Sequence, residues 1–150
     1  MKTYVLTLSQ EFPKTHKRAG EETNFVNKIF DGSKIHTIRS NYELWEKRIN
    51  EVKEGKAILS LRFWSGKPYN SKQVEFSKLS NDNDIDIQKI ENAVYSQNNT
   101  PESWKIGDNY FNNSKICEND GLSENDFIEW FRKYDLSKPM AIIHFTSKRY

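Results

Sequence analysis

The chain has 150 residues, 35% hydrophobic and 29% charged, and a net charge of +2. That length suits one compact domain with its own core, and so small a charge does not by itself indicate nucleic-acid binding. Cys117 is the single cysteine, which excludes an internal disulfide, and no apolar run approaches a membrane span. We therefore expect a cytoplasmic protein with no membrane contact.

The first part of the chain is predicted to contain a strand, a short helix and a second strand. Residues 3–9 alternate apolar and polar side chains, which favours a strand over a signal peptide. Thr23 is a good N-cap for the helix, and Gly32 stands where a helix often ends. The apolar face of this helix would consist of Val26, Ile29 and Phe30. A strand over 34–39 should follow.

The middle of the chain predicts a helix and a hairpin. Asn41 can cap the helix, whose apolar positions recur every three or four residues. These positions are Trp45, Ile49 and Val52. Strands over 56–64 and 72–79 are joined by turn-forming residues. Residues 80–103 are rich in Asn, Asp and Gln, and we expect an insertion loop there, with a short helix over 87–95 as the alternative.

The last part predicts a helix followed by a strand. Ser123 can cap a helix that extends to about Tyr134. Its apolar face would be formed by Phe127, Trp130, Phe131 and Tyr134. Residues 140–147 read as the closing strand. The chain has no internal repeat and no clear linker, so we predict a single α+β domain over 1–150, with a small curled sheet or partial barrel and flanking short helices.

The segment from Gly32 to Arg39 carries the first candidate chemistry. On a regular strand Thr37 and Arg39 share one face and Lys34 lies on the other. Lys34 can therefore meet Thr37 only if it lies in the turn before the strand or if the strand bulges. In that case Lys34 could take the proton of Thr37, with Arg39 helping to lower the pKa of the lysine. The alternative is a solvated strand edge.

Two acidic residues form the second candidate. Glu118 and Asp120 precede the last predicted helix, where the helix dipole favours carboxylates. Either side chain could orient Lys34 or carry a proton, and either could instead belong to a solvated capping loop. The histidines lack the spacing of metal ligands, so no metal or other cofactor is expected.

The predicted hairpin carries the third candidate. Its turn interleaves basic and aromatic side chains, namely Arg62, Trp64, Lys67, Tyr69 and Lys72. Such a mixture stacks on bases and neutralises phosphates. A hairpin with packed aromatics and exposed lysines has the same pattern, so both interpretations remain open.

One stretch resembles a known family. Residues 25–40, FVNKIFDGSKIHTIRS, resemble the opening of the ASCH domains of the PUA-like superfamily, in which a short helix leads into G-x-K-x-x-T-x-R. The four positions of that motif are filled here by Gly32, Lys34, Thr37 and Arg39. Residues 118–131 resemble the acidic loop and helix of the same family. The resemblance covers roughly residues 24–75 and 104–146, and it implies a small β-barrel with flanking helices.

The resemblance also implies a function. Certain small bacterial ASCH proteins are amidohydrolases that remove the acyl group from N4-acylated cytidines with a lysine, a threonine and a glutamate. By motif these roles fall on Lys34, Thr37 and Glu118, with Asp120 as a rival for the last one. Arg39 would hold the ligand or stabilise an oxyanion. This chain is longer than those minimal enzymes, which leaves its own activity open.

Many PUA-like domains bind RNA instead, and this is the alternative that the resemblance leaves open. The contacts would then come from Trp64, Lys67 and Tyr69 together with Arg39. The expected partner is thus a nucleoside or RNA, and no obligatory protein partner is implied.

Overall fold

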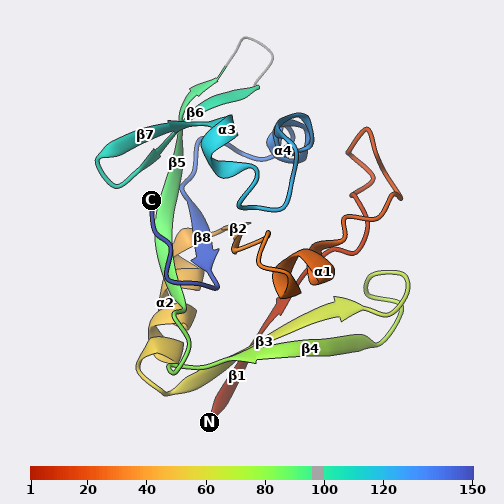
Figure 1. The fold of residues 1–150 in the computed structure, drawn as a ribbon, viewed down its shortest axis with the longest axis vertical. Helices are drawn as coiled ribbons and strands as arrows, with labels where there is room; N and C mark the ends of the chain where they lie inside the picture. The colour runs from red at the N-terminus through yellow and green to blue at the C-terminus, as the bar shows by residue number, and fades with distance from the viewer. Residues whose placement is uncertain (96–99) are drawn as a thin grey trace.

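The computed structural model describes residues 1–95 and 100–150 as an α+β fold (Figure 1). The strands are β1 Lys2–Thr7, β2 His36–Ser40, β3 Ala57–Trp64, β4 Gln73–Leu79, β5 Asp86–Tyr95, β6 Pro101–Ile106, β7 Asn109–Asn112 and β8 Met140–His144. The helices are α1 Phe25–Phe30, α2 Tyr42–Lys53, α3 Asn113–Ile116 and α4 Glu124–Phe131. The predicted α+β class is confirmed.

The strands form two sheets. The smaller sheet has the order β1-β3-β4, with β1 parallel to β3 and β4 antiparallel to it. The larger sheet has the order β2-β8-β5-β6-β7, and all of its neighbours are antiparallel. Within the described residues neither sheet closes on itself. In Figure 1 the smaller sheet lies at the N-terminal end of the molecule, and α4 lies at the opposite end.

Strand β8 explains why the molecule has two apolar clusters. All five of its residues are buried, so it reads as a continuous apolar run instead of an alternating one. Met140 and Ile142 pack into a cluster with residues of α3 and α4, whereas Ala141 and Ile143 face a cluster with residues of α2 and the smaller sheet. Each face of β8 thus contributes to a different core.

Two predicted helix starts are confirmed by their capping bonds. The side chain of Asn41 accepts a hydrogen bond from the backbone N–H of Leu44, and that of Ser123 accepts one from Asp126. The predicted apolar face of α2 is confirmed, because its Trp45, Ile49 and Val52 are buried. For the last helix, Phe127 and Phe131 are buried, and Trp130 and Tyr134 are partly buried against the same cluster.

Three sequence predictions about secondary structure are wrong. Residues 86–95 form neither a loop nor a helix but β5, a strand inside the larger sheet. The N-cap of α1 is Asn24, and the Thr23 hydroxyl donates to the Ser9 carbonyl at 2.7 Å while its oxygen accepts a hydrogen bond from the Phe25 N–H at 3.3 Å. The helix buries Phe25 and leaves Phe30 exposed, so the predicted face is only partly right, since Ile29 does pack against the cluster formed with α2 and the smaller sheet.

Candidate functional site

A cavity of about 170 Å³ opens where β1, β2, α1 and α4 approach one another. Its walls include Phe25, Lys34, Thr37, Arg39, Asp120, Trp130 and Tyr134. The volume is below the roughly 300–1,000 Å³ of pockets for drug-sized ligands. The cavity is therefore too small for a whole drug-sized ligand and suits one small group.

Lys34 reaches this cavity because it precedes the strand. Gly32 adopts φ +83°, which lets the chain turn after α1, and β2 begins only at His36. The Lys34 backbone N–H donates to the Lys28 carbonyl, and that of Ile35 donates to the carbonyl of Asn119, each at 2.9 Å. Lys34 therefore lies before the strand, where side chains need not alternate between the two faces of a sheet. It lines the same cavity as Thr37.

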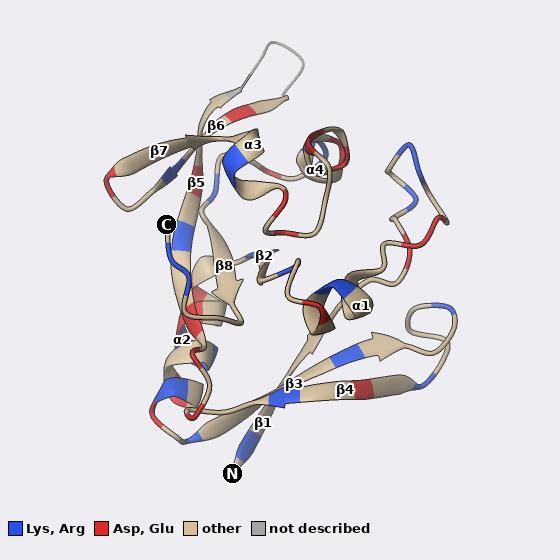
Figure 2. Ribbon diagram, viewed as in Figure 1, with Lys and Arg blue, Asp and Glu red and all other residues tan. Residues whose placement is uncertain are grey.

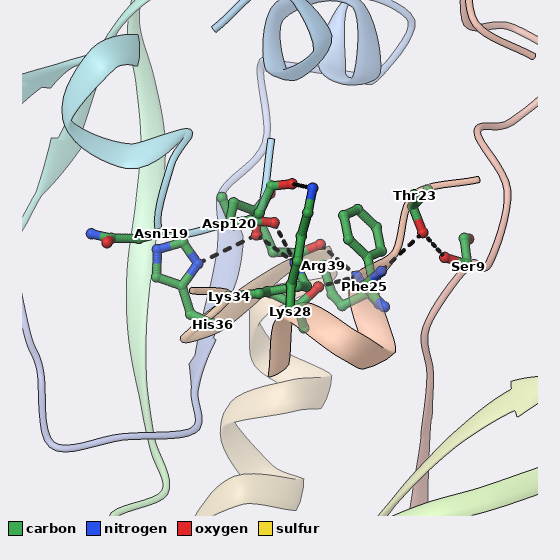
Figure 3. Close-up of polar contacts among 12 residues, drawn as sticks. Ser9, Thr23, Phe25, Lys28, Lys34, His36, Arg39, Asn119 and Asp120 are labelled. Atoms are coloured by element: carbon green, nitrogen blue, oxygen red, sulfur yellow. Dashed lines mark hydrogen bonds and ion pairs between the residues drawn. The ribbon is translucent and has the colours of Figure 1, made fainter. Parts of the chain in front are cut away.

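The ammonium group of Lys34 is held by Asp120 (Figure 3). Its Nζ donates to the Asp120 carbonyl at 2.6 Å and to carboxylate Oδ1 at 3.2 Å. The same nitrogen lies 4.2 Å from the ring centroid of Phe25, within the range of a cation–π contact. Lys34 is only 2% exposed, so these contacts replace water around a buried cation.

Burial has a large effect on the proton affinity of this lysine. It lowers the pKa of Lys34 to about 8, and the charge of Arg39 acts in the same direction, although Asp120 opposes both. Burial disfavours the charged form of Asp120 as well, but the charge of Lys34 and a hydrogen bond from His36 outweigh it and lower the pKa of Asp120. The site therefore contains a buried carboxylate beside a lysine that can release a proton near neutral pH.

Thr37 and Arg39 share one face of β2, as the strand alternation predicts. Nη1 of Arg39 donates to the Thr37 hydroxyl oxygen at 2.7 Å, and Nη2 donates to the carbonyl of Thr7 at 2.8 Å. Because Oγ1 of Thr37 accepts this bond, its own hydrogen remains available for a base. Nη1 of Arg39 also donates to the Ile38 carbonyl at 3.0 Å, and Arg39 lines the cavity without an ion pair to a carboxylate among the described residues.

Glu118 and Asp120 differ in placement. Glu118 is exposed and does not line the cavity, whereas Asp120 is 4% exposed and does. The chain continues the turn of α3 here, because the Asp120 N–H donates to the carbonyls of Ile116 and Cys117. Asp120 thus follows these two buried residues at helical spacing and points inward, while Glu118 points to solvent. That spacing is a signal in the sequence which could have favoured Asp120.

The aromatic residues of the hairpin lie outside the cavity. Trp64 ends β3, and Lys67 and Tyr69 are in the exposed loop before β4. Tyr69 is 87% exposed, and its ring centroid lies 5.1 Å from that of Trp64. Figure 2 shows basic residues at this end of the hairpin. The structure therefore places Lys34, Thr37, Arg39 and Asp120 on the walls of one cavity and leaves the hairpin residues as a separate surface. Among the described contacts Lys34 bonds to Asp120 and Thr37 to Arg39, and Lys34 and Thr37 do not bond to each other.

Two residues at the site were missed by sequence reasoning. His36 is fully buried with its Nδ1 at 3.3 Å from Oδ1 of Asp120, and the Tyr150 hydroxyl lies 2.6 Å from Nε2 of the same ring. A lone histidine on a strand gives no sign of such contacts. Tyr150 is 114 residues away in sequence, and no local pattern connects the two.

Comparison with known proteins finds no relative of this chain. No protein-family model matches the chain, and neither a curated protein nor a solved structure does. Over residues 1–95 and 100–150, no helix is both long and apolar enough to cross a membrane. In the same ranges no group of three or more His, Cys, Asp or Glu side chains could hold a metal ion.

Proposed function

We propose that the protein is an ASCH-type, PUA-like domain whose cavity binds a modified nucleobase and hydrolyses its exocyclic amide. The substrate class would be N4-acylated cytidines. One observation carries the proposal: a buried lysine whose pKa is lowered to about 8 lines the same small cavity as a threonine hydroxyl. A general base works best when its pKa is close to the working pH.

The proposed reaction begins with proton transfer. Neutral Lys34 takes the proton of the Thr37 hydroxyl, and Oγ1 forms a bond to the acyl carbon while the carbonyl electron pair moves to oxygen. The hydrogen bond from Arg39 to Oγ1 stabilises the negative charge that develops on Thr37 as the proton leaves. Asp120 holds Lys34 at the cavity through the contacts described above.

The second half of the reaction returns the groups to their starting state. The tetrahedral intermediate collapses with cleavage of the bond to N4, and the Lys34 ammonium protonates the departing amine. This leaves an ester on Thr37. Neutral Lys34 then takes a proton from water as the water oxygen attacks the ester carbon. The bond to Oγ1 breaks, and the Lys34 ammonium returns that proton to Oγ1, which releases the carboxylic acid and restores the threonine and the neutral lysine. In this scheme Asp120, which lines the cavity, replaces Glu118 as the carboxylate beside Lys34, and the proton for the leaving amine comes from Lys34 and not from a carboxyl group.

The test is incubation with N4-acetylcytidine and other acylated cytidines, followed by chromatography for cytidine. Thr37→Val is the principal control, because it removes the hydroxyl and keeps the shape of a β-branched side chain. Cytidine release by the wild-type protein and its loss in Thr37→Val are expected. Arg39→Ala should reduce turnover by about 10²–10³-fold, as the loss of a well-placed donor typically does. Failure of the wild-type protein to hydrolyse any member of the panel would refute the proposal.

A second function, RNA binding without catalysis, is favoured by the hairpin. Tyr69 exposes its ring beside Trp64, and Lys67 and Lys72 are exposed in the same loop. Stacking on such aromatic side chains is worth about 1–3 kcal/mol per base. If this surface binds single-stranded RNA, Tyr69→Ala should weaken binding, and the affinity should fall steeply as salt rises. Turnover of a neutral nucleoside in the cavity should change little with salt.

A further inference from the structure

A chain of four buried or half-buried polar side chains continues from Lys34 away from the cavity. Asp120 lies between Lys34 and His36 (Figure 3), with Oδ1 at 3.2 Å from Nζ of Lys34 and at 3.3 Å from Nδ1 of His36. Nε2 of His36 lies 2.6 Å from the Tyr150 hydroxyl, and Nδ2 of Asn119 donates to the same hydroxyl at 2.9 Å. The reaction proposed above does not use His36, Tyr150 or Asn119.

The hydrogens between these side chains can be assigned from the charge state of each group and from which atoms can donate or accept. An ionised carboxylate only accepts, so the hydrogen between Asp120 and His36 belongs to Nδ1 of the histidine. Burial lowers the pKa of His36, so the ring is neutral and its Nε2 must accept. The Tyr150 hydroxyl therefore donates to His36, and its oxygen accepts from Asn119. The contacts from Asn119 through Tyr150 and His36 to Asp120 thus each join one donor to one acceptor.

The tyrosine is itself fixed from several sides. Its backbone N–H donates to Oε1 of Gln88 at 2.9 Å, and Nε2 of Gln88 donates to the Tyr150 carbonyl at 3.0 Å. Its ring contacts Phe111 and His36. Burial raises the pKa of Tyr150 to about 12, so the hydroxyl keeps its hydrogen at neutral pH.

We infer that Tyr150 is a positioning residue for Lys34, which it reaches through His36 and Asp120. By donating to Nε2, it keeps the histidine in the tautomer that donates to Asp120. That donation takes up part of the negative charge of Asp120 and so limits how strongly the carboxylate holds the proton of Lys34. The use of this lysine as a base rests on the proposed function, whereas the effect on its proton affinity does not.

The other titratable or charged groups around this chain do not obscure the effect. They are Lys28 and Arg39 near Lys34, Cys117 near Tyr150, and His144 with the charges of Asp86 and Arg149 beside it. Burial lowers the pKa of His144 to about 3 and raises that of Cys117. Lys34 is therefore the group of this network that we expect to titrate at about pH 8.

The test measures the pKa of Lys34 by NMR titration of isotope-labelled lysine, with Lys34→Arg used to assign the signal. Tyr150→Phe removes only the hydroxyl, and the pKa of Lys34 should then rise by roughly half to one pH unit. Tyr4→Phe is the matched control, because it also loses a phenol hydrogen bond of 2.6 Å, here to Glu51, and neither of these two residues lines the cavity. Asn119→Ala should shift the same pKa in the same direction by less, and it carries the test if Tyr150→Phe does not fold.

The outcomes separate this inference from the proposed function. An unchanged Lys34 pKa in the folded tyrosine variant, or an equal shift in Tyr4→Phe, would overturn the positioning role even if acylated cytidines are hydrolysed. The expected shift in a protein that hydrolyses none of them would support the role of Tyr150 and refute the enzyme. Where turnover exists, the pH profile of kcat/KM should move by the same amount as the NMR titration, with KM unchanged.

Discussion

Gly121 is packed directly against the side chain of Lys34. A Cβ on Gly121 would lie 3.2 Å from Cβ and Cδ of Lys34, and the glycine has φ +82°. Its carbonyl also accepts a hydrogen bond from Nζ of Lys28 at 2.7 Å. The loop that carries Asp120 can thus pack closely against Lys34 because the next residue, Gly121, has no side chain.

This packing predicts a specific loss of stability in Gly121→Ala. Gly20→Ala is a matched control, because Gly20 has φ +84° and open space around its Cβ position. Left-handed backbone should cost the control about 1–2 kcal/mol, and overpacking against Lys34 should add about 1–3 kcal/mol in Gly121→Ala. Urea unfolding measures both. Equal losses of unfolding free energy in the two variants would show that the Lys34 side chain moves aside at no cost in stability.

The ion pair of Lys34 and Asp120 predicts strong coupling in a double-mutant cycle. Lys34→Met leaves a buried carboxylate without its cation, and Asp120→Asn leaves a buried ammonium without its anion. Each should lower the free energy of unfolding by about 3–5 kcal/mol. The double variant should lose clearly less than the sum, because neither charge remains. Additive losses would mean that the two groups do not stabilise each other.

The lowered pKa of Lys34 predicts how stability depends on pH. In the unfolded chain the lysine keeps its ordinary pKa of 10.5, whereas in the folded protein the pKa is about 8. Between these values the unfolded state binds more protons, so the contribution of Lys34 to the free energy of unfolding rises with pH. Urea unfolding of the wild-type protein and Lys34→Met across this range isolates the effect. A constant difference between the two would contradict the lowered pKa.

The placement of the acidic residues predicts unequal effects on activity. Asp120→Asn should reduce hydrolysis of N4-acetylcytidine by about 10²-fold or more, because the group that holds the base loses its charge. Glu118→Gln should leave the rate unchanged, since Glu118 is exposed outside the cavity. Steady-state kinetics of the two variants decide the assignment, and the reverse order of effects would restore Glu118 to the role.

The sequence correctly predicts the helices and strands whose signals lie within a few neighbouring residues. Asn41 and Ser123 cap their helices as expected, and the apolar run of β3 forms the predicted strand. Strand β5 was missed because its pairing shifts register between Asn92 and Val94, which breaks the alternation that marks a strand. The surrounding segment, residues 80–103, is rich in Asn, Asp and Gln, which is typical of a loop.

Only the part of the candidate site that lies in one continuous segment of the chain could be predicted from the sequence. Gly32, Lys34, Thr37 and Arg39 lie within eight positions, and a turn before the strand is enough to bring them together. The carboxylate comes from a loop 86 residues further along the chain. In that loop the sequence offers both Glu118 and Asp120 as candidates for the site carboxylate. Tyr150 reaches the site through tertiary packing, which no spacing in the sequence encodes.

The pH dependence of kcat/KM for N4-acetylcytidine tests the central claim most directly. The account predicts that the rate constant rises with pH as one group with a pKa of about 8 loses its proton. Thr37→Val should abolish the reaction at every pH. Lys34→Met, once shown to be folded, should leave only a trace of activity with no such rise. A wild-type protein that releases no cytidine, or one whose rate is independent of pH in this range, would contradict the role of Lys34 as the base.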